Sequence, residues 1–209
     1  MRRRTRSVFA IAALALVVPT AVAEAGGNHA GHSDGAHGAG RHRASTVRFA
    51  TFNASMNRFS AGALGAELAV PGSTQPDVID TIIQKTRPDV LLLNEFDYDP
   101  QALADFQTNY LEVPHGDAAP IHYEYSFIAP SNTGVPSGFD YDNSGGVGDF
   151  GPGDSYGFGF FPGQFGMAVL SKYPIDHDRL RTFQNFRWVD MPGALLPDDP
   201  STPEPGDWY

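Results

Sequence analysis

The sequence predicts an α/β fold from three consecutive segments. Residues 47–53 alternate between apolar and polar side chains, a pattern typical of a half-buried strand. In residues 76–85 the apolar side chains recur at helical spacing, and Pro76 suits the first turn of a helix. Residues 89–96 form a continuous apolar run that closes with a carboxylate. A strand, a helix and a fully apolar strand in this order predict an α/β layer with a buried inner strand.

Further elements are predicted along the rest of the chain. Residues 100–110 favour a short helix, and residues 123–129 and 166–171 favour strands. Residues 179–188 give a weaker strand pattern. The segment 191–209 contains five prolines, so we expect an irregular surface segment there.

The composition excludes several classes of protein. A hydrophobic content of 41% with 12% aromatic residues is enough for one packed core. The formal charge is −10 and the chain has only two lysines, which excludes a basic nucleic-acid-binding module. The absence of cysteine excludes a disulfide scaffold, a thiolate zinc site and a cysteine nucleophile.

The N-terminus predicts export. Residues 1–23 contain four arginines, an apolar run over residues 8–18, and small residues at 21–23, which is the order of a secretory signal peptide. The run of 11 residues is shorter than the 18–20 or so that span a bilayer, although a retained membrane anchor is the alternative. We therefore expect a secreted, extracellular mature protein without a membrane span.

Residues 24–45 form a linker rich in histidine and glycine. Four of the seven histidines lie there without core-forming residues, so a disordered spacer is predicted. The alternative is loose binding of zinc or copper. With the acidic loop 136–156, the linker would then make the protein a metal-sequestering one.

Two later segments leave alternatives open. The loop 136–156 is rich in glycine and aspartate, but Gly151 stands where an EF-hand needs a bidentate Glu, so an EF-hand is rejected. A mobile, solvated loop is predicted there, with a noncanonical Ca²⁺ site as the alternative. Residues 156–165 place aromatic side chains between glycines; we expect them to fill the core, and stacking on a substrate is the alternative.

Asn53 and Glu95 close the first two predicted strands. Side chains at strand ends of an open α/β sheet converge on the crevice where ligands bind. A carboxylate at the end of an apolar strand is costly unless it is solvated, paired or bound to a cation, and Mg²⁺ accepts one or two such ligands. Spacing alone leaves a metal ligand and an ordinary exposed strand end equally open for Glu95.

Three segments in order resemble the endonuclease/exonuclease/phosphatase superfamily of metal-dependent phosphoesterases. Residues 47–53 (VRFATFN) are similar to its opening strand, which ends in an active-site Asn. Residues 87–95 (RPDVLLLNE) are similar to the strand that carries its metal-binding Glu, and residues 165–175 (FGMAVLSKYPI) to its Gly-x-Ala-x-Leu-Ser-x-x-Pro-Ile strand and turn. Each match is weak alone, and the order of the three carries the resemblance.

The resemblance implies a fold and a chemistry. The fold would be a four-layer sandwich of two mixed β-sheets flanked by helices, formed by residues 46–209. Glu95 would be a metal ligand for Mg²⁺ or Mn²⁺, with Ca²⁺ as a further option, and Asn53 would be catalytic, on the phosphate side. The substrate would be a phosphoester, whether nucleic acid, nucleotide or small phosphoester. No segment points to a protein partner.

The family's later motifs, a His, an Asp-x-Asn pair and a terminal Asp-His, are missing. Residues 148–151 (GDFG) precede the 166–171 strand, and residues 176–178 (DHD) directly follow the 173–175 turn, so both look-alikes are rejected. We therefore expect a C-terminally incomplete domain, an N-terminal half that is inactive alone and exposes apolar surface. The alternative function is a catalytically dead secreted binding or accessory protein on the same fold.

Overall fold

The computed structural model describes residues 46–147, 153–196, 201 and 203. The predicted signal peptide (1–23) and the His/Gly-rich linker (24–45) lie outside the described residues. The described part begins at residue 46, the first residue of the predicted domain 46–209. The division of the chain into signal peptide, linker and domain remains a prediction.

A mixed four-stranded sheet forms the centre of the fold. Its strands are β1 (Phe49–Met56), β2 (Val90–Phe96), β3 (Tyr125–Ile128) and β4 (Met167–Ser171), in the spatial order β1-β2-β4-β3. β1 and β2 are parallel, whereas β4 is antiparallel to both β2 and β3. The predicted α/β class is confirmed, and the most apolar strand, β2, is an inner strand as expected.

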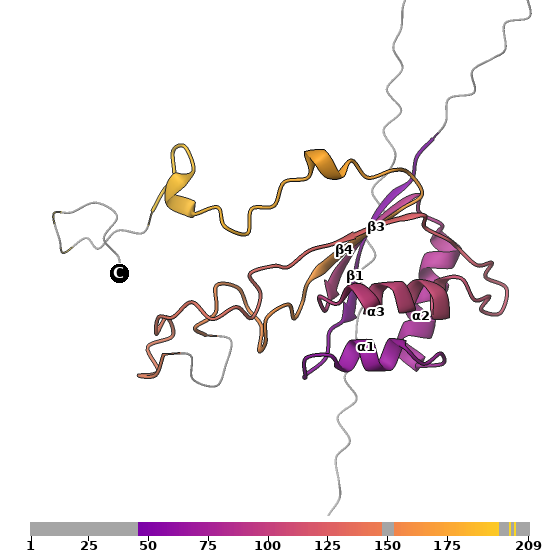
Figure 1. The fold of residues 1–209 in the computed structure, drawn as a ribbon, viewed down its shortest axis with the longest axis horizontal. Coiled ribbons are helices and arrows are strands. Elements are labelled where there is room, and N and C mark those ends of the chain that lie inside the picture. The colour runs from indigo at the N-terminus through magenta and orange to yellow at the C-terminus, as the bar shows by residue number, and fades with distance from the viewer. Residues whose placement is uncertain (1–45, 148–152, 197–200, 202, 204–209) are drawn as a thin grey trace, which may run out of the picture.

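The helices lie together beside the sheet (Figure 1). They are α1 (Ala63–Leu68), α2 (Thr74–Thr86) and α3 (Pro100–Phe106), which continues into a π-helix (Gln107–Leu111). Asp99 caps α3, because its carboxylate accepts hydrogen bonds from the backbone N–H groups of the first turn. The buried Gln84 of α2 donates to carbonyl groups at the end of the π-helix, the nearest being that of Val113 at 2.7 Å. This bond fixes the loop that follows the π-helix against α2.

One face of the sheet forms the hydrophobic core. Alternate strand residues such as Leu91, Leu93 and Leu170 are buried against apolar side chains of the helices, among them Leu64, Leu68, Ile79, Ile83, Phe106 and Tyr110. The opposite face is less buried, and at its margins Phe49 and Met167 are 74% and 53% exposed. A second sheet is not found among the described residues, so what is seen is one sheet-and-helix half of the sandwich that the resemblance implies.

The structure differs from the predicted elements after β4. The weak strand pattern at 179–188 is wrong: the chain there makes no ladder, and short 3₁₀ turns occupy His177–Arg179 and Trp188–Asp190. Figure 1 shows this segment running away from the sheet, and none of the described strands pairs with its backbone. α1 was not predicted, because a helix of six residues is too short for a clear periodicity.

Candidate active site

A bulge between β1 and β2 shapes the candidate site. Two residues of β1, Ala54 and Ser55, lie opposite the single residue Glu95 of β2. Ser55 and Glu95 both adopt left-handed backbone conformations, with φ of 51° and 56°. Strict alternation after Leu93 would point Glu95 into the core, but the bulge changes the phase, so that Phe96 is fully buried instead. The carboxylate therefore stays out of the core, near the ends of β1 and β2.

Three side chains from β1 and the residue after it hold the carboxylate of Glu95. Asn53 Nδ2 donates to Oε1 at 2.8 Å, and Asn57 Nδ2 donates to Oε2 at 3.2 Å. Ser55 Oγ donates a longer bond of 3.4 Å to Oε2. Asn53, Ser55, Asn57 and Glu95 are together called the Glu95 site. Both sequence-predicted site residues, Asn53 and Glu95, are therefore in direct contact.

The hydrogen-bond network fixes the orientation of the Asn53 amide. Its Oδ1 accepts the backbone N–H of Ser55 at 3.0 Å, which leaves the NH₂ group facing Glu95. Asn53 therefore serves as a donor in this arrangement, and its side-chain oxygen is already in use. The only anionic oxygens of the Glu95 site are those of Glu95 itself.

The donor set fits a hard divalent cation. Among the described residues, no basic side chain forms an ion pair with Glu95. A half-buried carboxylate that is oriented by neutral donors but has no cationic partner offers one oxygen ligand of the kind Mg²⁺ takes. Water and substrate phosphate oxygens usually complete such a site, so a single protein carboxylate is compatible with it.

Asp97 joins three chain segments at the rim of the Glu95 site. It is 5% exposed, and its carboxylate accepts the backbone N–H groups of Arg58 at 2.8 Å and Phe165 at 3.1 Å. Burial raises the pKa of Asp97 above its usual range, while these hydrogen bonds oppose the shift. The buried Gln164 completes the junction by donating to the carbonyl of Arg58 at 2.6 Å. The end of β1, the end of β2 and the loop before β4 are therefore tied together.

The aromatic segment before β4 is more exposed than expected. Phe158 and Phe160 are 62% and 51% exposed, and their rings lie 5.9 Å apart in an edge-to-face arrangement. Phe158 also contacts the ring of Phe165, with centroids 5.7 Å apart. The expectation that residues 156–165 fill the core is wrong for these exposed rings. A segment held by backbone bonds to Asp97 and Gln164 does not need its aromatic rings for packing.

The acidic loop gathers three carboxylates, those of Asp140, Asp142 and Asp154, within 4.8 Å of one another. Asp154 is buried and accepts the backbone N–H of Tyr141 at 2.7 Å, while Asp140 accepts that of Ser144 at 3.0 Å. These carboxylates already bind backbone N–H groups of their own loop. An oxygen-only cluster of this kind also suits Ca²⁺.

The two look-alike motifs rejected from the sequence lie in different parts of the chain. Asp176, His177 and Asp178 are exposed at a 3₁₀ turn, and the ring of His177 contacts that of Phe127. Residues 148–151 lie outside the described residues.

Comparison with known proteins gives the family to which the chain belongs. The sequence model of the endonuclease/exonuclease/phosphatase family matches residues 50–208, and the chain belongs to this family. No curated protein and no solved structure gives a significant match. The family comprises divalent-metal-dependent enzymes that act on phosphoesters, and the acidic clusters of this chain could hold a metal ion. In the described part of the chain, every helix is too short or too polar to cross a membrane.

The sequence reasoning missed Ser55, Asn57 and Asp97. The first two continue the spacing of two residues that begins at Asn53, so the polar side of the strand pattern extends beyond residue 53. Asp97 follows Glu95 by two residues, but nothing in the sequence shows that its carboxylate holds backbone groups from two other segments.

Proposed function

We propose that the protein is a secreted, divalent-metal-dependent phosphoesterase in which Glu95 is a metal ligand. The observation that carries the proposal is the carboxylate of Glu95, which three neutral donors hold at a strained bulge and which has no cationic partner within residues 46–147 and 153–196. Backbone strain of this kind clusters at functional sites, because the surrounding structure must hold it in place. The family match supports the same reading.

The residues of the Glu95 site have separate roles in this proposal. Glu95 binds the cation, and Mg²⁺ or Mn²⁺ is the expected ion because the ligand is a carboxylate oxygen. Asn53 and Asn57 keep the carboxylate in one orientation, so that little reorganisation is needed during the reaction. When bound, the cation would supply a positive charge that stabilises negative charge developing on the phosphate. The bulge keeps these groups out of the core at the ends of β1 and β2, where Asn53 is exposed and Glu95 is half-buried.

The substrate proposed is a small organic phosphoester or a nucleotide. The formal charge of −10 disfavours tight binding of a long nucleic acid, whereas contact through the metal would survive it. The exposed rings of Phe158 and Phe160 offer a surface on which the organic part of a substrate can stack. Both rings belong to the segment before β4. Asp97, two residues after Glu95, ties this segment to the end of β2 through the backbone N–H of Phe165.

The proposal is tested by the activity of the full gene product. We expect hydrolysis of bis(p-nitrophenyl) phosphate or p-nitrophenyl phosphate with Mg²⁺ or Mn²⁺, its loss in excess EDTA, and its recovery when the metal is restored. Comparison of the diester with the monoester, and of nucleotides with alkyl phosphates, gives the substrate class. A full gene product that binds the metal and the phosphoesters without hydrolysing any of them would instead support the catalytically dead binding protein.

Secretion is a separate part of the proposal, and the charged, apolar and small-residue order of residues 1–23 supports it. We expect the exported protein to lack these residues. Mass spectrometry of material from the culture medium measures this directly, and an intact N-terminus beginning at Met1 would contradict cleavage.

A further inference from the structure

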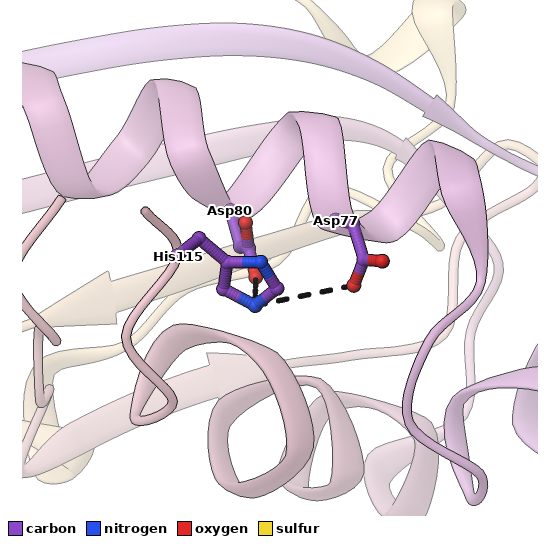
Figure 2. A group of neighbouring side chains, drawn as sticks. All are labelled: Asp77, Asp80 and His115. Atoms are coloured by element: carbon purple, nitrogen blue, oxygen red, sulfur yellow. Dashed lines mark ion pairs between the residues drawn. The ribbon is translucent and has the colours of Figure 1, made fainter. Parts of the chain in front are cut away.

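A second group of metal-ligating side chains lies on other elements than the Glu95 site. Asp77 and Asp80 are three residues apart on α2 and therefore share one face of that helix. His115 reaches them from the loop after the π-helix, and Figure 2 shows its ring beside both carboxylates. One ligand atom from each of the three residues lies within 4.8 Å of the others.

Asp80 is the buried member of this group. Its side chain is fully buried, and its Oδ1 accepts a hydrogen bond from Thr81 Oγ1 at 3.1 Å. Its Oδ2 lies 2.9 Å from Nε2 of His115, but the contact lacks hydrogen-bond geometry, and both atoms are buried without a hydrogen-bond partner in the part of the chain that the structure describes. A buried carboxylate oxygen and a buried imidazole nitrogen without hydrogen bonds are costly, so the pair alone does not account for the arrangement. Burial also raises the pKa of Asp80 to about 6, in spite of the nearby His115.

The separations of the ligand atoms suit a common ion. Zinc bonds of about 2.0–2.1 Å at tetrahedral angles place two ligand atoms about 3.3 Å apart. Nε2 of His115 lies 2.9 Å from Oδ2 of Asp80 and 3.9 Å from Oδ1 of Asp77, on either side of that value. We infer that Asp77, Asp80 and His115 form a binding site for a divalent transition metal ion, with Zn²⁺ as the best candidate. The imidazole ligand favours zinc over Mg²⁺ and Ca²⁺, which prefer oxygen ligands.

The surroundings of this three-residue site allow an ion to enter and be held. An open cavity of about 380 Å³ is lined by Asp77 and His115, with Thr74 and Thr81 beside them, so that a water molecule can take the fourth position. His115 is held by a tight turn, in which its backbone pairs with that of Ala118. A bound ion would cross-link α2 to the loop that carries His115 and would stabilise the folded state.

The test uses the full chain in a background that removes competing imidazoles. The linker histidines are first replaced by asparagine, because they could bind zinc themselves: His29, His32, His37 and His42. Zinc binding is then measured by calorimetry in competition with a chelator of known affinity, together with the thermal unfolding temperature. We expect this chain to bind zinc and to unfold at a higher temperature when zinc is present.

The variants decide whether the inferred residues hold the ion. His115→Ala should abolish one zinc equivalent and its effect on the unfolding temperature, and Asp77→Asn should weaken that equivalent at least tenfold. Asp77 is partly exposed, so its variant remains informative if His115→Ala fails to fold. His122→Ala is the matched control, because His122 pairs with a glutamate on the exposed surface, and it should bind zinc like the parent. Glu95→Gln should retain the equivalent as well, which separates this site from the proposed catalytic one. Zinc binding that is unchanged in both His115→Ala and Asp77→Asn, or absent from the parent, would overturn the inference.

Discussion

Replacing Glu95 by Gln removes a charge from the Glu95 site while keeping the size of the side chain. The Gln oxygen can still accept the 2.8 Å bond from Asn53. The Gln amide group, however, would face the Nδ2 donor of Asn57, where Oε2 now accepts at 3.2 Å. The substitution therefore sets two donors against each other and leaves the proposed cation without its anionic ligand.

The size of the effect follows from the loss of the anionic ligand. Without it the cation is held less well and stabilises less of the negative charge that develops on the phosphate. Losing one such electrostatic contact costs about 3 kcal/mol in the transition state, and each 1.4 kcal/mol or so is a factor of ten in rate. We therefore expect turnover to fall about 10²-fold and the metal concentration for half-maximal activity to rise at least tenfold. Since Glu95 is only half-buried, the free energy of unfolding should change by less than about 1 kcal/mol.

The assay is a titration of Mg²⁺ or Mn²⁺ against phosphoester hydrolysis by the full gene product, with thermal unfolding measured in parallel. Glu112→Gln is the control, since Glu112 pairs with His122 and is not part of the Glu95 site. It should keep parental activity and metal dependence. If Glu95→Gln also keeps both, Glu95 is not a metal ligand and the proposed mechanism fails.

Three further predictions concern catalysis, pH dependence and the core. Asn53→Ala removes the donor that lies 2.8 Å from Glu95 Oε1 but leaves the charge of Glu95, so turnover should fall about tenfold. The metal concentration for half-maximal activity should rise less than it does in Glu95→Gln. Steady-state kinetics in which both variants behave alike would contradict this prediction. Hydrogen bonds from the backbone N–H of Arg48 and from Lys172 hold the pKa of Asp89 below its usual 3.8. The stabilisation by the Asp89 carboxylate is therefore fully present above pH 3.8 and is lost as the pH falls through the lower pKa of the folded state. Asp89→Asn should therefore lower the free energy of unfolding by about 1 kcal/mol at pH 7 and by progressively less in acid. A difference in urea unfolding that does not change with pH would refute this role of the Asp89 carboxylate. Leu93→Ala leaves a cavity at a fully buried position and should lower the free energy of unfolding in urea by about 2–5 kcal/mol. A loss below about 1 kcal/mol would show that Leu93 is not packed as described.

The order of the central elements could be predicted because their patterns are local. The alternating first strand, the helical spacing of residues 76–85 and the apolar run of β2 each report burial within a single element. The strand pattern at 179–188 failed for the opposite reason, since a strand also needs a neighbour to pair with. The strand patterns placed Asn53 and Glu95 at the ends of the first two strands, and the structure brings their side chains into contact.

The remaining features of the sites depend on contacts between distant residues. Ser55 and Glu95 have positive φ although neither is glycine, so no residue type signals the bulge. The spacing of Asp77 and Asp80 could be read from the helix, but the position of His115 depends on how the π-helix ends. Gln84 sets that end by binding carbonyl groups that follow it by almost thirty residues.

The sheet order has a consequence for the rate at which the protein folds. β1, α1, α2 and β2 are consecutive in the chain, so their contacts can form without closing a long loop. Pairing of β2 with β4 must instead close the whole connection from Phe96 to Met167, and such distant contacts slow folding. The bonds from Phe96 N to the Gly166 carbonyl and from Phe165 N to Asp97 form only when β4 arrives. The rim of the Glu95 site is therefore completed late in folding, and substitutions in the segment before β4 should alter the refolding rate of the protein as well as its stability.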